Sequence, residues 1–258
     1  VVCTSVGLKR KINQDNFYIN GVINNNTSDF FFRSFFASHK EQLLCICDGM
    51  GGEADGETAE FIAVKTLLKA RQKYKTFFNE FEKNIASYVM SANNNLCKYI
   101  KEHDNRKIGS TVAAVCISPK SQGAIAANVG DSKVFLYRRS KLIKISEDHN
   151  EAQSLVSIGI ISEEEARTHK DKSKLTQHLG MDSNELIIEP FISDNIILEK
   201  EDIFLLCSDG LTDMLSYKEI GDILKQNMSI KKVCKKLVDA ANKHGGRDNI
   251  TVILSKIT

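Results

Sequence analysis

Four short motifs along this chain each place an aspartate beside glycine or asparagine. They occupy residues 10–15, 48–52, 208–210 and 246–249, and their carboxylates belong to Asp15, Asp48, Asp209 and Asp248. The last three motifs lie at the end or the start of short apolar runs that are typical of β-strands. Carboxylates this far apart in the sequence meet only if the fold brings the strand ends together. Carboxylate oxygens without Cys or His partners suit hard cations such as Mg²⁺ or Mn²⁺.

Each motif taken alone also has an ordinary structural interpretation, because Asp-Gly is a frequent turn pair. Asp48-Gly49 follows a buried run directly, and the flanking glycines allow backbone and metal to approach closely. Asp209 has the same setting, whereas Asp248 precedes the final predicted strand. Asp131 lies in a predicted hairpin turn, and whether it also faces the site is open at this point. Several such aspartates in one chain favour the metal interpretation over chance.

Arg10 adds a cation to the predicted site, and Thr111, at the start of a strand, is a candidate supporting hydroxyl. A guanidinium presents a fork of donors that matches the oxygens of a phosphate group. A water shared by two cations loses its proton near neutral pH, and the cations also neutralise charge on phosphoryl oxygens. No C-x5-R loop offers a cysteine-based route. The residues therefore predict a two-metal phosphate-ester hydrolase, for which no covalent phosphoenzyme is needed.

Composition restricts the class of protein. The chain has 258 residues, of which 42% are hydrophobic and 26% charged, as in an ordinary globular domain. With 35 basic and 33 acidic residues the net charge is only +2, which argues against nucleic acid or an anionic membrane as partner. No apolar run in the given residues approaches the ~18 residues that span a bilayer or has the form of a secretory h-region. Seven Cys without a C-x-x-C pair predict buried thiols in a reducing compartment, the cytoplasm.

The remaining pattern alternates between strands and helices. Strands are predicted over residues 43–47, 111–117, 123–128, 133–138, 142–145, 186–192, 203–207 and 250–257, and helices over 56–74, 77–100, 216–225 and 229–243. Ser162 to Glu165 form a capping box that begins a short helix. Runs of strands separated by pairs of helices favour an α+β fold in which two antiparallel sheets are flanked by helix pairs.

Residues 21–40 form an unusual stretch, in which three asparagines precede a group of phenylalanines. Asparagine runs resist regular structure, whereas phenylalanine favours burial. We expect a long β-hairpin or loop insertion. Its phenylalanines either pack on the core, which is the favoured interpretation, or meet a partner.

Taken in order, the motifs resemble the metal-dependent protein phosphatases of type 2C, in particular the bacterial form. The matching stretches cover nearly the whole chain and are residues 7–15, 48–52 with 56–57, 109–111, 128–132, 147–149, 175–176 with 179–180, 206–211 and 246–251. The resemblance implies a four-layer α-β-β-α sandwich, one catalytic domain over residues 1–258, and a flap at about 150–176. The implied activity is hydrolysis of phosphoserine and phosphothreonine in proteins by a hydroxide that bridges two Mn²⁺ or Mg²⁺ ions.

The resemblance also implies a role for each site residue. Asp48 bridges the two cations, Asp209 and Asp248 hold the first, and the Gly49 carbonyl touches the second. Asp131 with Asp209 matches the pair that holds a third, weaker cation. As implied catalytic residues, Arg10 grips the substrate phosphate and Asp15 orients metal-bound water.

The chain departs from the family pattern at several positions. Animal relatives have Glu and His where this chain has Gln14 and Met50, so the proton donor is unassigned. A metal-bound water is one candidate, and His149 and His169 are others, although each is better interpreted as structural or surface. Lys170 and Gln177 replace the family's usual Pro and Arg, so substrate contacts of the flap are expected to differ.

Three rival functions compete with this interpretation. A pseudophosphatase that binds phosphoproteins would have lost metal carboxylates, and these are present. The chain could also be a regulatory phosphatase domain of a larger signalling protein, and the full-length gene sequence would decide between the two. A two-metal nuclease would be expected to show a basic groove, which the near-neutral charge does not favour. We expect a monomer that acts on phosphorylated proteins, with a serine/threonine kinase as a candidate partner.

Overall fold

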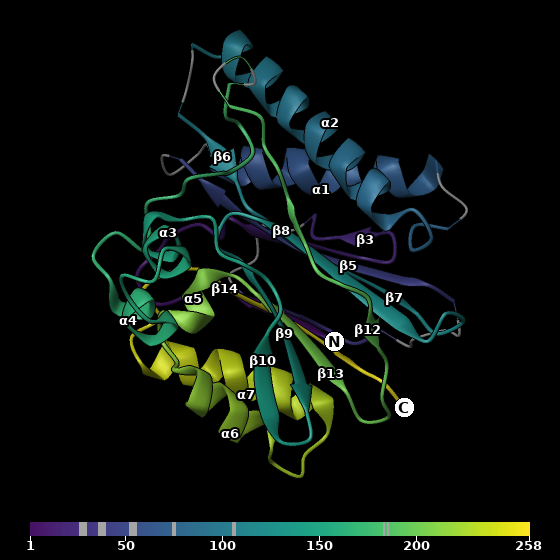
Figure 1. The fold of residues 1–258 in the computed structure, drawn as a ribbon. Coiled ribbons are helices and arrows are strands. Elements are labelled where there is room, and N and C mark those ends of the chain that lie inside the picture. The colour runs from purple at the N-terminus through teal and green to yellow at the C-terminus, as the bar shows by residue number, and fades with distance from the viewer. Residues whose placement is uncertain are drawn as a thin grey trace.

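The computed structural model describes residues 1–25, 30–35, 40–51, 56–73, 76–104, 107–182, 184 and 186–258. Within these residues two antiparallel sheets stack face to face, and helices cover both outer faces (Figure 1). Sheet I has the order β10-β9-β13-β14-β1-β4 and sheet II the order β11-β8-β7-β5-β2-β3. Short strand β12 pairs with β8 in sheet II, and β6 pairs with β5. The predicted α+β sandwich of four layers is confirmed.

The strand bounds show which predictions hold. The strands of sheet I are β1 Val2–Ser5, β4 Phe30–Arg33, β9 Lys133–Arg138, β10 Lys141–Lys144, β13 Ile203–Cys207 and β14 Ile250–Lys256. The strands of sheet II are β2 Asp15–Ile19, β3 Val22–Ile23, β5 Gln42–Met50, β7 Val112–Ser118, β8 Gly123–Val129, β11 Phe191–Ile192 and β12 Ile196–Ile197, with β6 Gly109–Ser110 beside β5. Most predicted strands are confirmed, whereas β1, β2 and the two-residue strands β6 and β12 were not predicted.

The helices form two outer layers. Helices α1 Gly56–Lys73 and α2 Phe81–Glu102 cover sheet II, and α6 Tyr217–Leu224 and α7 Ile230–Lys243 cover sheet I (Figure 1). Short helices α3 Glu151–Ser157, α4 Glu163–Thr168 and α5 Asp209–Thr212 lie at one end of the sandwich. The capping box predicted at Ser162 and Glu165 is present. Helix α7 buries residues at three-to-four spacing, the pattern by which its sequence predicted a helix.

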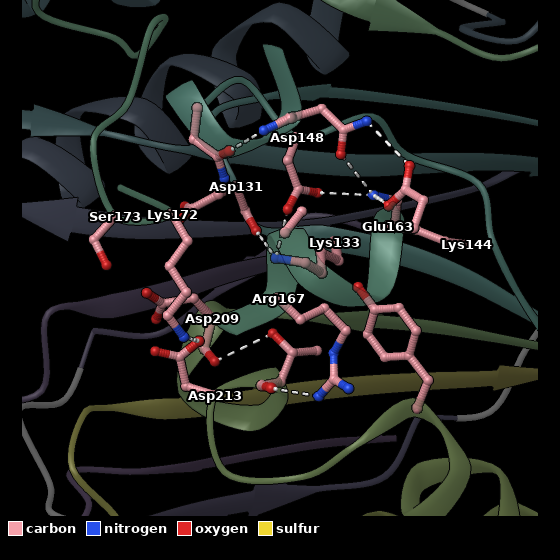
Figure 2. Close-up of a pocket in the computed structure, with 15 residues that line it drawn as sticks. Asp131, Lys133, Lys144, Asp148, Glu163, Arg167, Lys172, Ser173, Asp209 and Asp213 are labelled. Atoms are coloured by element: carbon pink, nitrogen blue, oxygen red, sulfur yellow. Dashed lines mark hydrogen bonds and ion pairs between the residues drawn. The ribbon is translucent and has the colours of Figure 1, made fainter. Parts of the chain in front are cut away.

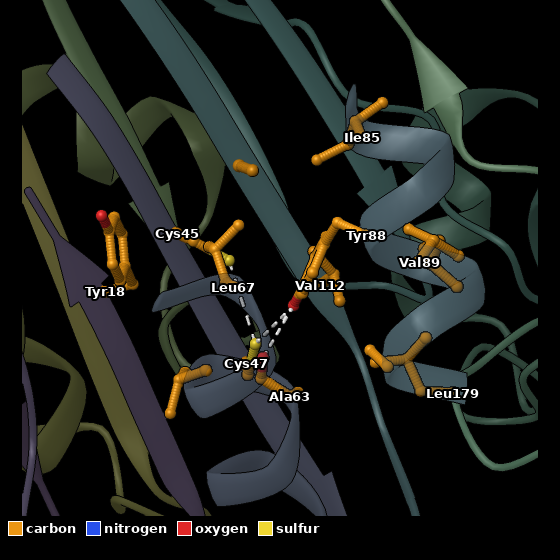
Figure 3. Close-up of a cluster of buried hydrophobic side chains, with 14 of the residues drawn as sticks. Tyr18, Cys45, Cys47, Ala63, Leu67, Ile85, Tyr88, Val89, Val112 and Leu179 are labelled. Atoms are coloured by element: carbon orange, nitrogen blue, oxygen red, sulfur yellow. Dashed lines mark hydrogen bonds between the residues drawn. The ribbon is translucent and has the colours of Figure 1, made fainter. Parts of the chain in front are cut away.

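Three apolar layers result from this stacking. One lies between α1, α2 and sheet II, the second lies between sheet I and α6 with α7, and the third fills the space between the sheets. Figure 3 shows the first layer, where the hydroxyl of Tyr88 on α2 lies 3.9 Å from Cys47 Sγ of β5. All seven cysteines are free, and six of them are buried, in agreement with the prediction of small buried thiols. No helix among the described residues is long and apolar enough to span a bilayer.

Two sequence predictions need correction. Residues 186–192 form a strand only at Phe191–Ile192, because Leu186 and Ile187 lie exposed and Pro190 interrupts the run. Within residues 21–25, 30–35 and 40, β3 and β4 belong to different sheets and do not pair as a hairpin, so the loop-insertion alternative is the one that remains.

The phenylalanines of that stretch divide between burial and exposure. Phe31 packs on Phe17 with ring centroids 5.5 Å apart, so packing on the core holds for that residue. Phe30 and Phe32 remain 45% and 38% exposed, and Phe36 lies outside the described residues.

Candidate metal centre

Strand pairing in sheet II sets the geometry of the first two carboxylates. Asp15 on β2 is the direct cross-strand partner of Asp48 on β5. Along β5, Leu44 and Ile46 face the layer between the sheets, and Asp48 follows at the same two-residue spacing. On β2, Phe17 faces the same layer between the sheets, and Asp15 precedes it by two residues. Both carboxylates therefore enter the edge of the inter-sheet layer, on the side that faces sheet I.

Sheet I supplies those partners from two adjacent strands. Asp209 follows β13 as the first residue of α5, and Asp248 precedes β14. Ser208 continues the inward side of β13, and its Oγ donates a hydrogen bond of 2.7 Å to Asp15 Oδ2. Asp131, in the turn between β8 and β9, completes the group at 8% exposure. The structure thus brings together all five predicted acidic residues.

The electrostatics agree that these five carboxylates lie in one site. Burial raises the pKa of Asp48 well above its usual value, and the charges of Asp15, Asp209, Asp131 and Asp248 raise it further. The pKa of Asp209 is likewise raised well above its usual value, by burial and then by Asp131, Asp213 and Asp248. Burial is also the main cause that raises the pKa of Asp15 to about 7 and that of Asp131 to about 6. Ionisation of these carboxylates is therefore unfavourable unless positive charge compensates it.

Arg10 lies on the loop before β2 and reaches the cluster at Asp248. Its Nη2 donates a hydrogen bond of 2.7 Å to Asp248 Oδ2, while about half of its side chain is exposed. Asn249, buried to 3% exposure, holds this loop. Its Nδ2 donates to the carbonyls of Val6 and Ile12, each at 2.9 Å, and its Oδ1 accepts from the Gln14 amide at 2.8 Å. Sequence reasoning placed Asn249 in a motif but missed this role.

Glycines allow the site to close against α1. An added Cβ at Gly49 would lie 2.1 Å from the Gly56 carbonyl oxygen, at the first residue of α1. The Gly49 amide donates to the Gln14 carbonyl at 2.8 Å, which fixes the end of β5 against the loop before β2. Strand β5 also runs on to Met50, so Asp48 lies within the strand. The sequence pattern predicts instead that the strand ends at residue 47 and that Asp48 follows it.

The hydroxyl and imidazole candidates have structural partners. Thr111 Oγ1 accepts from the Asp48 amide at 3.1 Å and hydrogen-bonds to Ser132 Oγ at 2.6 Å, so it supports the backbone of the site. His149 Nδ1 accepts from the Gly130 amide at 3.4 Å, and burial lowers its pKa. His169 ends helix α4, and its Nδ1 accepts from the Asp171 amide at 3.2 Å. These contacts agree with structural roles for both histidines.

The donor set fits hydrated divalent cations. Within the described part of the chain no three His, Cys, Asp or Glu side chains converge on one point as a ready metal cage. Mg²⁺-type ions, however, keep several waters and take only one or two carboxylates each. The buried Oδ1 of Asp15 has no hydrogen-bond partner in the described structure, and a water bound to such an ion could supply one. The residues therefore fit hydrated ions and not an all-protein cage.

A small cavity of roughly 30 Å³ adjoins the cluster beneath residues 150–176. Asp131 and Asp209 line its floor, and Glu163, Arg167 and Lys172 line its cover (Figure 2). Ion pairs that the sequence did not reveal surround it. These pairs are Lys133 with Asp148 at 2.9 Å, Lys144 with Glu163 at 2.9 Å and Lys172 with Asp213 at 2.6 Å.

A four-layer α-β-β-α sandwich with an acidic cluster at one sheet edge defines a class of metal-dependent phosphatases, and comparison with known proteins agrees. The family model described as "Protein phosphatase 2C" matches residues 24–255, and the chain belongs to that family. A serine/threonine phosphatase of Listeria welshimeri is 34% identical over 217 residues, which cover 83% of this chain and 84% of that protein. A putative 2C-type protein phosphatase of Streptococcus pyogenes is 32% identical over 254 residues, or 97% and 94% of the two chains.

A solved structure gives the same result. The S. agalactiae serine/threonine phosphatase superposes with a TM-score of 0.83 at 29% identity, over 99% of this chain and 97% of that one. The protein is thus a protein phosphatase of the 2C type.

Proposed function

We propose that this phosphatase hydrolyses phosphoserine and phosphothreonine in proteins by using two divalent cations, Mn²⁺ or Mg²⁺. The observation that carries the proposal is the convergence of Asp15, Asp48, Asp131, Asp209 and Asp248 from both sheets. Burial, together with neighbouring carboxylates, raises the pKa values of Asp15, Asp48, Asp131 and Asp209, so the cluster favours ligands that bring positive charge. The names of the Listeria and Streptococcus relatives support the substrate class.

Each carboxylate has a proposed position in this site. Asp48, whose pKa the charges of four other aspartates raise, would lie between the two ions. Asp209 and Asp248, on the ends of adjacent strands, would hold the first ion, and the Gly49 carbonyl would contact the second. Asp131 with Asp209 would hold a third ion more weakly. When bound, the cations would supply a deprotonated water for attack and would neutralise charge on the phosphoryl oxygens.

Arg10 and Asp15 would act on the substrate and on water. Arg10 is half-exposed and bound to Asp248 by one nitrogen, so its fork can turn toward a phosphate that enters the site. Asp15 is fixed through Oδ2 by Ser208, which leaves Oδ1 to accept a hydrogen bond from a water. Nearby positive charge would lower the pKa of Asp15 again and keep it ionised as that acceptor.

The wider setting is part of the same proposal. We infer one catalytic domain over the chain that acts as a monomer, with residues 150–176 as a flap and a serine/threonine kinase as the opposing enzyme. The seven free thiols support a reducing compartment such as the cytoplasm.

The test is hydrolysis of p-nitrophenyl phosphate and of a phosphothreonine peptide with Mn²⁺, with and without EDTA. Asp209→Asn should lose about 10³-fold in turnover, because it removes a proposed ligand while keeping the shape of the side chain. Asp222→Asn is the matched control, since Asp222 is exposed on α6. EDTA should abolish turnover in wild type and control alike.

Absence of turnover in a folded, Mn²⁺-loaded wild type would contradict the proposal. It would favour a phosphoprotein-binding role, to be tested by binding of the same peptide.

A further inference from the structure

Residues 150–176, hereafter the 150–176 segment, lie over the acidic cluster with few apolar contacts. Its apolar side chains Ile158 and Ile160 are 70% and 65% exposed, and only Ala152 and Ala166 among its apolar residues are buried. Burial of two alanines contributes little to holding such a segment. Polar contacts with the protein beneath it therefore decide its position.

These polar contacts form two separate attachments. At the first, Lys144 of β10 binds Glu163 Oε2 at 2.9 Å and Gln153 Oε1 at 3.2 Å. At the second, the segment reaches α5 and the loop after it. Arg167 donates there to the Leu215 carbonyl at 3.1 Å, and Lys172 Nζ lies 2.6 Å from Asp213 Oδ1. The two attachments differ in what lies behind them.

Asp213, behind the second attachment, belongs electrostatically to the proposed cation site. The Asp213 amide donates to the Asp209 carbonyl at 2.8 Å, so Asp213 lies one helical turn after Asp209 on the same face. Its charge acts on both Asp209 and Asp131. Figure 2 shows the Lys172 side chain directed from the cover toward Asp209 and Asp213. The segment thus places its own positive charge against the cluster.

We propose that Lys172 is a positioning residue whose ammonium group and a divalent cation compete for the acidic group of Asp131, Asp209 and Asp213. This inference rests on the proposed function, since it concerns the weaker cation of that site. Without the cation, Lys172 stays on Asp213 and holds the 150–176 segment closed. Cation binding repels the ammonium group and releases the segment at this attachment.

The sign of the coupling follows from charge alone. Two positive charges that share carboxylates repel each other, and the reduced solvent at this site strengthens the repulsion. Coupling between two binding events is reciprocal. If the bound cation weakens the ion pair of Lys172 with Asp213, this ion pair weakens cation binding by the same free energy. Removal of the ammonium group should therefore tighten the weaker cation site.

The experiment compares wild type with Lys172→Met, which keeps the length of the side chain and removes its charge. Free Mn²⁺ is counted by electron paramagnetic resonance during titration, and amide hydrogen exchange of residues 151–176 is followed with and without Mn²⁺. We expect Lys172→Met to bind the weakest Mn²⁺ about 5-fold more tightly, at the low end of usual coupling. Wild-type exchange in the segment should accelerate on saturation with Mn²⁺. The variant should exchange fast in both states.

Two further variants separate the pairing from general electrostatics. Lys170→Met makes the same change of charge two residues away, at an exposed lysine for which the described structure shows no ion pair, and should leave both measurements near wild type. Asp213→Asn also frees Lys172 and should loosen the segment, but it should weaken Mn²⁺ binding because it removes a negative charge.

The inference is overturned if Mn²⁺ leaves wild-type exchange unchanged or slows it, or if Lys172→Met and Lys170→Met shift Mn²⁺ affinity equally. A folded wild type that binds no Mn²⁺ would instead overturn the proposed function, and this inference with it.

Discussion

The floor of the site and its cover are held by different physical means. The floor consists of buried strands, where Asp15 and Asp48 are fixed by backbone pairing and by apolar layers on both sides of sheet II. The 150–176 segment rests instead on ion pairs whose side chains are partly exposed, such as Lys144 with Glu163 and Lys172 with Asp213. Exposed pairs of this kind contribute at most about 1 kcal/mol each.

This difference separates two tasks. Like charges repel, so only a rigid frame can hold several carboxylates together until cations neutralise them. A cover must admit substrate, and weak polar attachments allow it to open at low cost. Changes in the floor should therefore alter global stability, whereas changes in the cover should alter local opening.

The largest expected effect is at Gly49. Gly49→Ala would place a methyl group 2.1 Å from the Gly56 carbonyl oxygen and 3.0 Å from that of Gln14, so α1 must move away from β5. We expect a loss of about 3 kcal/mol or more in the free energy of unfolding, measured by urea denaturation. Gly221→Ala is the control, because its Cβ would meet nothing closer than 3.9 Å within α6. Equal stability of the two variants would show that the floor is not rigid.

A somewhat smaller effect is expected at Asn249. Asn249→Ala would remove three hydrogen bonds to the backbone of residues 6, 12 and 14 and leave those groups without their partner. The expected loss is about 2–3 kcal/mol in urea denaturation, with a raised KM because the loop that carries Arg10 loosens. Arg10→Ala should raise KM about tenfold without that loss of stability. An Asn249→Ala protein with unchanged stability would rule out Asn249 as the support of this loop.

The buried carboxylates of the floor should also make the stability of the metal-free protein depend on pH. Burial raises the pKa of Asp15 to about 7 and of Asp131 to about 6, from 3.8 in the unfolded chain. Between pH 3.8 and about pH 7 the folded state binds more protons than the unfolded state, so the free energy of unfolding falls as pH rises. With EDTA we expect a loss of about 2 kcal/mol between pH 6 and pH 8 in urea denaturation.

Divalent cations should reverse this pH trend, because they favour the ionised carboxylates. Metal-free stability that rises over the same pH range would show that these carboxylates are already compensated within the chain. The Asp209→Asn protein should show a shallower slope than wild type, since it lacks one of the repelling charges.

The floor was largely predictable from sequence because its signals are local. An apolar run followed by Asp-Gly is enough to identify Asp48 and Asp209 as candidate ligands. The alternation of apolar residues in β5 also specifies the face on which Asp48 lies. Strand β2 escaped prediction because only five residues form it and its first two are polar. The pairing of Asp15 with Asp48 could therefore be inferred only from the family resemblance.

The cover was not predictable in the same way. Lys172 and Asp213 are 41 residues apart, and nothing in their local sequence distinguishes them from solvated surface charges. The three hydrogen bonds of Asn249 likewise depend on the path of a loop more than 230 residues earlier in the chain. Contacts of this kind follow from tertiary packing, which single-sequence patterns do not encode.

The smallest effect is expected in the cover, at Glu163. Glu163→Gln removes the charge that pairs with Lys144 but keeps an oxygen that can accept from Gln153 Nε2, now at 3.0 Å. Because Glu163 is about half exposed, we expect less than about 0.5 kcal/mol in urea denaturation. Amide hydrogen exchange of α4 should nevertheless become about twofold faster, because the ion pair of Lys144 with Glu163 opposes local opening of the 150–176 segment. Glu164→Gln is the control, because Glu164 pairs with Arg167 within the same segment. A global loss above about 1.5 kcal/mol would mean that Glu163 is integral to the folded frame, and the contrast between a rigid floor and a weakly attached cover would fail.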